Sequence, residues 1–216
     1  MYNYFNMAII DTPKDICSEN VDIAIWHITE SEQQLTNLCQ IKGIDANIIN
    51  GTKLEKRRIE MLCEHLLIEH LTSQVCLLQH TCTGAPVLQS QKHGNISISH
   101  TKQYVAVAIS THHIGIDIER QTPQVLRVRN KFLTESEKEA LPATDIAANV
   151  TAWTAKEAMY KAINVPGIDF SHQITIDASA IASGCRNYQC RYGQRVFSAH
   201  THQADDYVAT LVTEYK

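Results

Sequence analysis

The amino-acid sequence predicts an α+β protein whose two halves meet near residue 113. Segments with the two-residue period of a half-buried strand surround a segment with helical periodicity, and helices and strands follow again in the second half. No Gly/Ser-rich or Pro-rich stretch separates the halves, so we expect residues 1–113 and 114–216 to pack closely. A chain of 216 residues that is 44% hydrophobic can bury a substantial core.

The first half is predicted to hold one helix among several strands. Thr52 and Glu55 have the spacing of a capping box, and six apolar residues then share one helical face: Ile59, Leu62, Cys63, Leu66, Leu67 and Leu71. Strands are predicted at 21–25, 75–79, 95–99 and 104–110, with a turn at 83–86.

The second half begins with a predicted strand at 114–118 and continues with two helices. A second capping box, Thr134 with Glu137, opens the shorter helix, and residues 145–163 form the longer one. The remaining strands are predicted at 174–176, 188–192, 196–200 and 207–212.

Composition excludes several classes of function. The net charge of -4 and pI near 6.2 argue against a general nucleic-acid-binding protein, which needs a positive field. No stretch approaches the ~20 apolar residues of a membrane span, and the N-terminal sequence is not that of a signal peptide. Seven irregularly spaced cysteines indicate reduced thiols, so we expect a cytoplasmic protein without membrane contact.

Two acidic residues at the end of a predicted strand are the first candidates for chemistry. Asp117 and Glu119 are two positions apart, so a strand projects both carboxylates from one face while Ile116 and Ile118 point into the core. Both carboxylates can then point at one cation. An acidic pair at a strand end is also ordinary solvated surface.

A second acidic candidate lies in the longer helix. Glu157 and Lys161 are one turn apart on the same side, which fits either a shared site or a plain surface ion pair. Three carboxylates and a lysine suit a hard divalent cation that holds a phosphorylated ligand.

Ser99 and His100 form the third element, at the end of a predicted strand. A histidine beside a hydroxyl can donate to a phosphate, but most of the eleven histidines are expected to be structural or solvated.

Taken in order, these segments resemble the 4'-phosphopantetheinyl transferase superfamily. The pattern is a Ser-His after a strand, then G-(I/V)-D-(I/V)-E, then W-(S/T)-x-K-E-A-x-x-K, which here are Ser99-His100, GIDIE at 115–119 and WTAKEAMYK at 153–161. The match covers about the middle third of the chain. The length and the D-x-E spacing resemble the two-domain, surfactin-synthetase-activating type, which implies two similar halves related by a pseudo-twofold axis.

The resemblance implies a transferase activity of the holo-acyl-carrier-protein synthase type. Asp117, Glu119 and Glu157 would hold Mg²⁺, with Mn²⁺ as an alternative. Ser99 and His100 would meet the 3'-phosphate of the co-substrate coenzyme A, and Lys161 its diphosphate. A serine of an apo acyl or peptidyl carrier protein would attack the β-phosphate and release 3',5'-ADP, with Glu157 as general base, directly or through water.

The sequence departs from the family at the turn before the Ser-His strand. The family often has Gly-Lys-Pro there, whereas this chain has Gly84-Ala85-Pro86. Arg57 or Arg58 on the first helix are candidates to replace the lysine at the nucleotide, and Arg58 is our choice. Both arginines are also consistent with a solvated helix face.

Partner surfaces and competing functions stay open at this stage. A basic cluster could meet an acidic carrier protein, or be a mixed surface balanced by neighbouring glutamates: Arg120, Arg127, Arg129, Lys131 and Lys138. We expect a monomer. The alternatives are another magnesium-dependent, phosphodiesterase-like enzyme, which would need further ligands for a second metal, or a non-catalytic homologue that binds coenzyme A or a carrier.

Overall fold

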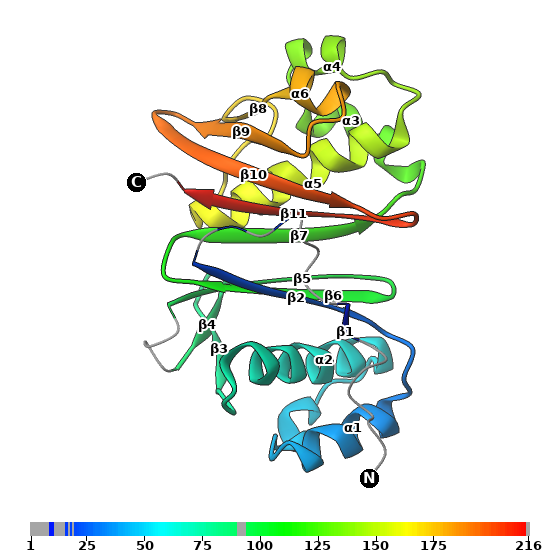
Figure 1. Cartoon of the computed structure of the whole chain (residues 1–216), viewed down its shortest axis with the longest axis vertical. Helices are drawn as coiled ribbons and strands as arrows, with labels where there is room; N and C mark the ends of the chain where they lie inside the picture. The colour runs from blue at the N-terminus through cyan, green and yellow to red at the C-terminus, as the bar shows by residue number, and fades with distance from the viewer. Residues whose placement is uncertain (1–8, 11–15, 17, 19, 90–93, 215–216) are drawn as a thin grey trace.

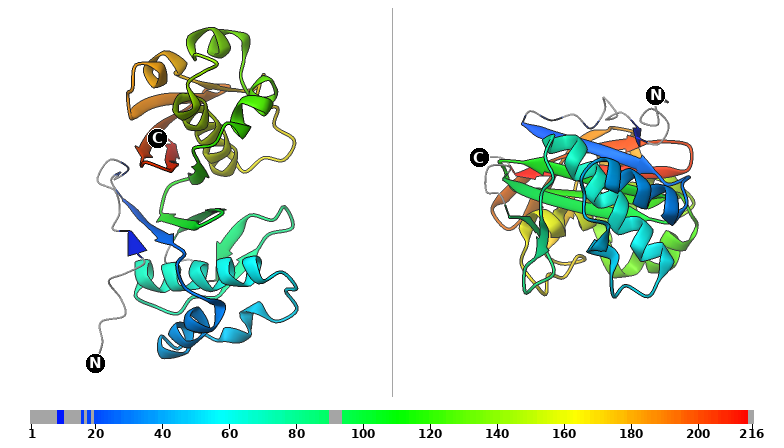
Figure 2. Two further views of the ribbon diagram at one scale, coloured as in Figure 1. Left: turned by 90° about the vertical axis from the view of Figure 1, so that its right-hand side faces the viewer. Right: turned by 90° about the horizontal axis from the view of Figure 1, so that it is seen from below.

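Two antiparallel sheets lie face to face, and helices cover the outer side of each (Figures 1 and 2). The structure is a computed structural model that describes residues 9–10, 16, 18, 20–89 and 94–214. The first sheet has the order β1-β2-β6-β5, with bounds Ile9–Ile10, Val21–His27, Tyr104–Ser110 and Asn95–Thr101. The second has the order β7-β11-β10-β9-β8, with bounds Ile114–Arg120, Tyr207–Glu214, Arg195–Gln203, Asn187–Tyr192 and Ile174–Ile176.

The outer face of the first sheet is covered by α2 (Glu55–Thr72), with α1 (Glu32–Ile41) and the short 3₁₀ helix η3 (Ala46–Ile49) packed against it (Figure 1). Leu62, Leu66 and Leu67 of α2 are fully or almost fully buried in the core between the helices and this sheet. A small hairpin of β3 (Leu78–His80) and β4 (Pro86–Leu88) lies beside the sheet. An amphipathic helix therefore closes the first core.

The second sheet is covered by α5 (Ile146–Ile163), which packs on β7 and β11. Three shorter helices surround α5: α3 (Gln124–Phe132), α4 (Glu135–Ala140) and α6 (Ala178–Ala182). Twelve of the eighteen residues of α5 are buried. Such a helix lies inside its half of the molecule and can carry side chains to the sheet.

The inner faces of the two sheets share a third apolar core. Ile23 and Ile25 of β2 and Ala106 of β6 face a layer that includes Ile116 and Leu211 from the second sheet. These five side chains are at most 2% exposed. The strand period predicted for both sheets explains this, because alternate residues face the shared core while their neighbours face the helices.

The predicted α+β fold is confirmed, and most of the predicted strands occur within a few residues of their expected bounds. The capping box of Thr134 and Glu137 is present in full at α4, and Asp145 caps α5. The strand predicted at 75–79 begins only at Leu78. The division into halves at residue 113 stays a prediction.

The capping box predicted at Thr52 and Glu55 is wrong. The N-cap of α2 is Leu54, which makes no side-chain cap, and the Thr52 hydroxyl instead lies 3.6 Å from the sulfur of Met61. The Arg58 side chain instead binds the backbone just before α2: its guanidinium donates to the carbonyl oxygens of Thr52 and Lys53 at 3.1 and 2.9 Å. A side chain from within the helix thus organises the entry to α2.

Two general expectations bear on the environment of the protein. No helix in the described residues is long and apolar enough to cross a bilayer. The six cysteines among the described residues are all free thiols, and burial raises the pKa of Cys39 to about 12. Cys17 lies outside the described residues.

Candidate active site

The predicted site is built where two edge strands, β5 of the first sheet and β7 of the second, run past each other. Alternate hydroxyls of β5 face β7. The Oγ atom of Ser97 accepts the backbone N–H of Ile116 at 2.9 Å, and that of Ser99 accepts the N–H of Ile118 at 3.4 Å. Side-chain hydroxyls therefore satisfy N–H groups that an edge strand would otherwise leave unpaired.

Helix α5 lies directly against the backbone of β7, because Gly115 leaves no side chain between them. A Cβ atom placed on Gly115 would lie 1.9 Å from the carbonyl oxygen of Ala158. This close approach brings Glu157 and Lys161, which flank the contact along α5, to the strand that carries Asp117 and Glu119. The glycine of the GIDIE segment is therefore a packing requirement.

Asp117 is the centre of the polar contacts. Its Oδ1 atom accepts from the Ser99 hydroxyl at 2.7 Å and from the Lys161 ammonium at 2.8 Å. The Lys161 ammonium also donates to the carbonyl oxygen of Ile116 at 2.8 Å. The Oδ2 atom of Asp117 is buried and has no hydrogen-bond partner. A buried carboxylate oxygen without a partner is costly and indicates a place for a ligand.

The three predicted carboxylates influence one another strongly. Burial raises the pKa of Glu157 to about 7, and the charges of Asp117 and Glu119 add to this rise, while Lys161 opposes it. Burial also raises the pKa of Glu119, followed by the charge of Asp117, and the side chains of Thr101 and Trp153 act in the opposite direction. The site therefore concentrates negative charge that one lysine compensates only in part.

This donor set fits a hard divalent cation. Mg²⁺ and Mn²⁺ take carboxylate oxygens and leave positions for water and phosphate. No group of three or more His, Cys, Asp or Glu side chains in the described part of the chain is already arranged around one point as a metal site. The carboxylates of residues 117, 119 and 157 would therefore have to rearrange to share one cation.

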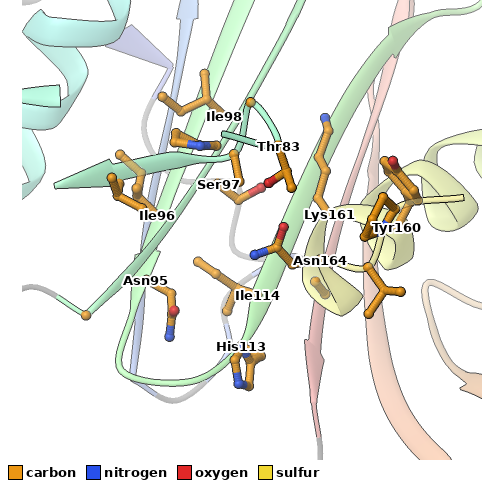
Figure 3. A pocket seen from close by; sticks show the side chains of 18 residues that line it. Thr83, Asn95, Ile96, Ser97, Ile98, His113, Ile114, Tyr160, Lys161 and Asn164 are labelled. Carbon is orange, nitrogen blue, oxygen red and sulfur yellow. The ribbon is translucent and has the colours of Figure 1, made fainter. Parts of the chain in front are cut away.

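A cleft of about 410 Å³ opens beside these groups (Figure 3). Its walls come from the β3–β4 turn, from β5, from the start of β7 and from the C-terminal end of α5. They include Ala85, Pro86, Ser97, His113, Tyr160, Lys161 and Asn164. Among the described lining residues, Lys161 and His113 are the basic ones. Ala85, where the resemblance leads one to expect a lysine, contributes no charge to the wall.

The part of the chain that carries the carboxylates is similar to known proteins. Residues 113–212 match the 4'-phosphopantetheinyl transferase superfamily. This part of the chain, a little under half of its length, is therefore similar to that superfamily. The chain is also 24% identical over 162 residues to the 4'-phosphopantetheinyl transferase gsp of Aneurinibacillus migulanus, an alignment that covers 73% of this chain and 65% of the relative. The superfamily match includes the whole of β7 and of α5, the two elements that carry the carboxylates.

The predicted Ser-His pair, Ser99 and His100, lies on β5, but its two side chains make different contacts. The Ser99 hydroxyl donates a hydrogen bond to Asp117. The His100 side chain is 40% exposed, and its Nδ1 atom lies 3.5 Å from the Oε1 atom of Glu60 on α2. His100 therefore points toward the outer helix of the first sheet, while Ser99 points toward the carboxylates.

The structure gives the two candidate arginines local partners. Arg58 binds Glu32 of α1 through its Nε and Nη2 atoms at 2.9 and 2.7 Å, besides the two carbonyl oxygens described above. Arg57 contacts Glu64 at 2.6 Å and Glu60 at 3.4 Å. These contacts place both guanidinium groups among residues of α1 and α2. Nucleotide binding by Arg58 stays a prediction, and its observed contacts are structural.

The basic cluster of the superfamily segment is smaller on the surface than its sequence suggests. Arg129 donates to the side chain of Asn149 and to the carbonyl oxygens of Lys138 and Leu141, so it ties α3 to α4 and α5. Lys138 is paired with Glu135 at 2.8 Å. Arg127 and Lys131 on α3 are exposed. They are the members of the cluster that are most open to a partner.

Several residues that organise the site did not stand out in the sequence. Lys156, next to Glu157, is fully buried, and its ammonium donates to Glu137 at 2.6 Å and to the carbonyl oxygens of Phe170 and Ile174 at 2.9 Å. It anchors the side of α5 that faces away from the carboxylates. The period-two order of Ser97, Ser99 and Thr101 was a readable signal for hydroxyls on one strand face.

A second metal centre, which a phosphodiesterase-like enzyme would need, has little support. The sequence does contain one His-x-His pattern, His200-Thr201-His202 on β10. The Nδ1 atom of His200 lies 3.0 Å from Asn187, and the ring of His202 packs against Tyr207 at 5.7 Å between centroids. These contacts fit structural histidines on the second sheet.

Proposed function

We propose that this protein transfers the 4'-phosphopantetheine arm of coenzyme A to a serine of an apo acyl or peptidyl carrier protein and releases 3',5'-ADP. The observation that carries the proposal is Asp117, which is held by Lys161 and Ser99 and keeps one buried oxygen free. It lies in the segment that matches the superfamily, and the relative from Aneurinibacillus migulanus bears the name of this activity.

Asp117, Glu119 and Glu157 are proposed to hold Mg²⁺ or Mn²⁺. The unpartnered Oδ2 atom of Asp117 and the raised pKa values of the two glutamates support this proposal, because a cation would supply the positive charge that these carboxylates lack. When bound, the cation would neutralise charge on the diphosphate of coenzyme A and make its phosphorus more electrophilic.

Lys161 is proposed to bind the diphosphate as well. An ammonium has three protons, and Asp117 and Ile116 accept two of them. Lys161 also lines the cleft, and its side chain is 27% exposed, so its remaining proton is proposed to meet a phosphate oxygen there. Its charge would stabilise the negative charge that develops on the leaving group.

Glu157 is proposed as the general base, directly or through a water molecule. Its pKa of about 7 makes it half ionised near neutral pH, where a general base is most effective. In the transfer, the serine oxygen forms a bond to the β-phosphorus, the bond from that phosphorus to the 3',5'-ADP oxygen breaks, and Glu157 receives the serine proton. Ligation to a cation would lower this basicity, which favours the water-mediated route.

His100 is proposed to bind the 3'-phosphate of coenzyme A, since its ring is partly exposed on the same strand as Ser99. Ser99 would lie beside the phosphate, although it would have to turn its proton away from Asp117 to donate to the phosphate.

Arg127 and Lys131 are the proposed contacts for an acidic carrier. We also propose a cytoplasmic monomer with halves 1–113 and 114–216 related by a pseudo-twofold axis.

Mass spectrometry of carrier proteins tests the proposal. The protein is incubated with coenzyme A, Mg²⁺ and a panel of apo carriers, and each carrier is weighed for one added phosphopantetheine. Glu157→Gln should abolish the transfer without changing the circular dichroism spectrum. Asp205→Asn, which alters an exposed carboxylate between β10 and β11, should transfer normally. Absence of any adduct with the folded wild-type protein would refute the proposed activity.

A further inference from the structure

Three hydroxyls of β5 connect the first sheet to the carboxylate-bearing strand of the second. Ser97, Ser99 and Thr101 occupy alternate positions and therefore project from one face of the strand. The hydroxyl of Ser97 accepts from a backbone N–H group of β7, that of Ile116. Ser99 and Thr101 reach carboxylates: the Thr101 hydroxyl donates to the Oε2 atom of Glu119 at 3.2 Å.

The two carboxylates of β7 thus each receive a neutral hydroxyl donor from the opposite sheet. For Asp117 the donor holds Oδ1, while Oδ2 stays unpartnered. For Glu119, which has one more rotatable bond, the Thr101 hydroxyl fixes Oε2 at a defined place. A neutral donor orients Glu119 without adding a second positive charge beside the cation, whereas Asp117 also accepts from the Lys161 ammonium.

We propose that Thr101 is a positioning residue for the divalent cation, which it serves by orienting Glu119 from the other sheet. This inference rests on the proposed function for the identity of the bound group. Groups that hydrogen-bond to metal-binding carboxylates commonly change metal affinity by 10- to 100-fold. Because 3.2 Å is long for a hydrogen bond between a hydroxyl and a carboxylate, we expect the smaller effect, about tenfold.

The test is a titration with Mn²⁺ alone, followed by the electron paramagnetic resonance signal of the free ion, without coenzyme A or carrier. Thr101→Val keeps the shape and strand preference of the side chain but removes the hydroxyl. It should weaken Mn²⁺ binding about tenfold. Thr101→Ser restores the hydroxyl and should return the affinity to within about twofold of wild type. In the transfer assay, Thr101→Val should raise the Mg²⁺ concentration for half-maximal rate and leave the rate at saturating Mg²⁺ nearly unchanged.

Ser97→Ala is the matched control, because its hydroxyl lies on the same strand face and contacts the backbone of β7. It should lower thermal stability and leave Mn²⁺ affinity unchanged. Equal affinity of wild type and Thr101→Val would overturn the inference, as would a Thr101→Ser variant as weak as Thr101→Val or an equal loss in Ser97→Ala. If Thr101→Val does not fold, Thr101→Ala replaces it, and failure of both to fold would make the role structural.

The titration separates this inference from the proposed function. If the wild-type protein binds no Mn²⁺, the proposed metal site is refuted, and the role of Thr101 is refuted with it. A wild-type protein that binds Mn²⁺ together with an unaffected Thr101→Val would leave the proposed function standing and remove only the role of Thr101.

Discussion

Gly115→Ala is the most direct test of how the site is assembled. Gly115 lies in β7 with an ordinary strand backbone, since its φ is not in the left-handed region. At such a position, replacing glycine by alanine normally stabilises a protein by about 0.4–1 kcal/mol, because the unfolded chain loses freedom. Here the sign should reverse, because the new Cβ atom would meet the Ala158 carbonyl oxygen at 1.9 Å.

The size of the effect follows from that distance. Contacts of a Cβ atom below 3.0 Å essentially do not occur, so α5 and β7 must separate by at least about 1 Å. The obstacle is backbone, which cannot rotate away, so we expect a loss of about 3 kcal/mol in the free energy of unfolding, the upper end for overpacked sites. Glu157 and Lys161 would move with α5, and a 1 Å displacement can lower a reaction rate by about 100-fold.

Urea unfolding measures the first effect, and the phosphopantetheine transfer rate well below the melting temperature measures the second. Gly51→Ala is the control, because that glycine has a φ of +85° and open space around it. It should lose about 1 kcal/mol through backbone strain and keep its transfer rate. A Gly115→Ala variant as stable and as active as wild type would refute the close packing of α5 on β7.

Two further predictions concern buried charge. Lys156→Met should lower the free energy of unfolding by about 3–5 kcal/mol, because it leaves the carboxylate of Glu137 buried without its ammonium partner. The control is Lys138→Met, which breaks a pair with the exposed Glu135 and should change the free energy of unfolding by less than about 1 kcal/mol. Urea unfolding measures both. The raised pKa of Glu157 means that the folded, metal-free protein holds a proton that the unfolded chain releases near pH 4.5, so this group's contribution is present at low pH and is lost as pH rises toward 7. In EDTA, the melting temperature of wild type should therefore fall relative to that of Glu157→Gln between pH 5 and pH 8, and parallel pH profiles would contradict the assignment.

Much of the fold could be predicted because the local signals and the tertiary structure agree. β6 occupies the predicted residues 104–110, β8 the predicted 174–176, and α5 begins and ends within one residue of its expected bounds. The helix α1 was missed although Ser31 and Gln34 form a complete capping box. Its hydrophobic face is narrow, with Leu35 and Cys39 as its buried residues, so its periodicity is weak.

The strand and helix positions of the proposed site residues were predictable one by one, but the contacts between these residues were not. The strand period placed Asp117 and Glu119 on one face, and the helix period placed Glu157 and Lys161 on another. That Ser99 bonds to Asp117 depends on how β5 and β7 meet across two sheets, which no local pattern encodes. Arg58 shows the converse, since a basic residue in a suitable place is held by Glu32, twenty-six positions earlier in the chain.

The shared apolar core between the two sheets has a consequence for synthesis of the chain. All strands of the first sheet lie before residue 111, so that sheet can form while the second half is still being translated. Its inner face, with Ile23 and Ile25, then has no cover until β7 and β11 have left the ribosome. During that interval an apolar face of the nascent protein is exposed to water, and such a face is prone to aggregation.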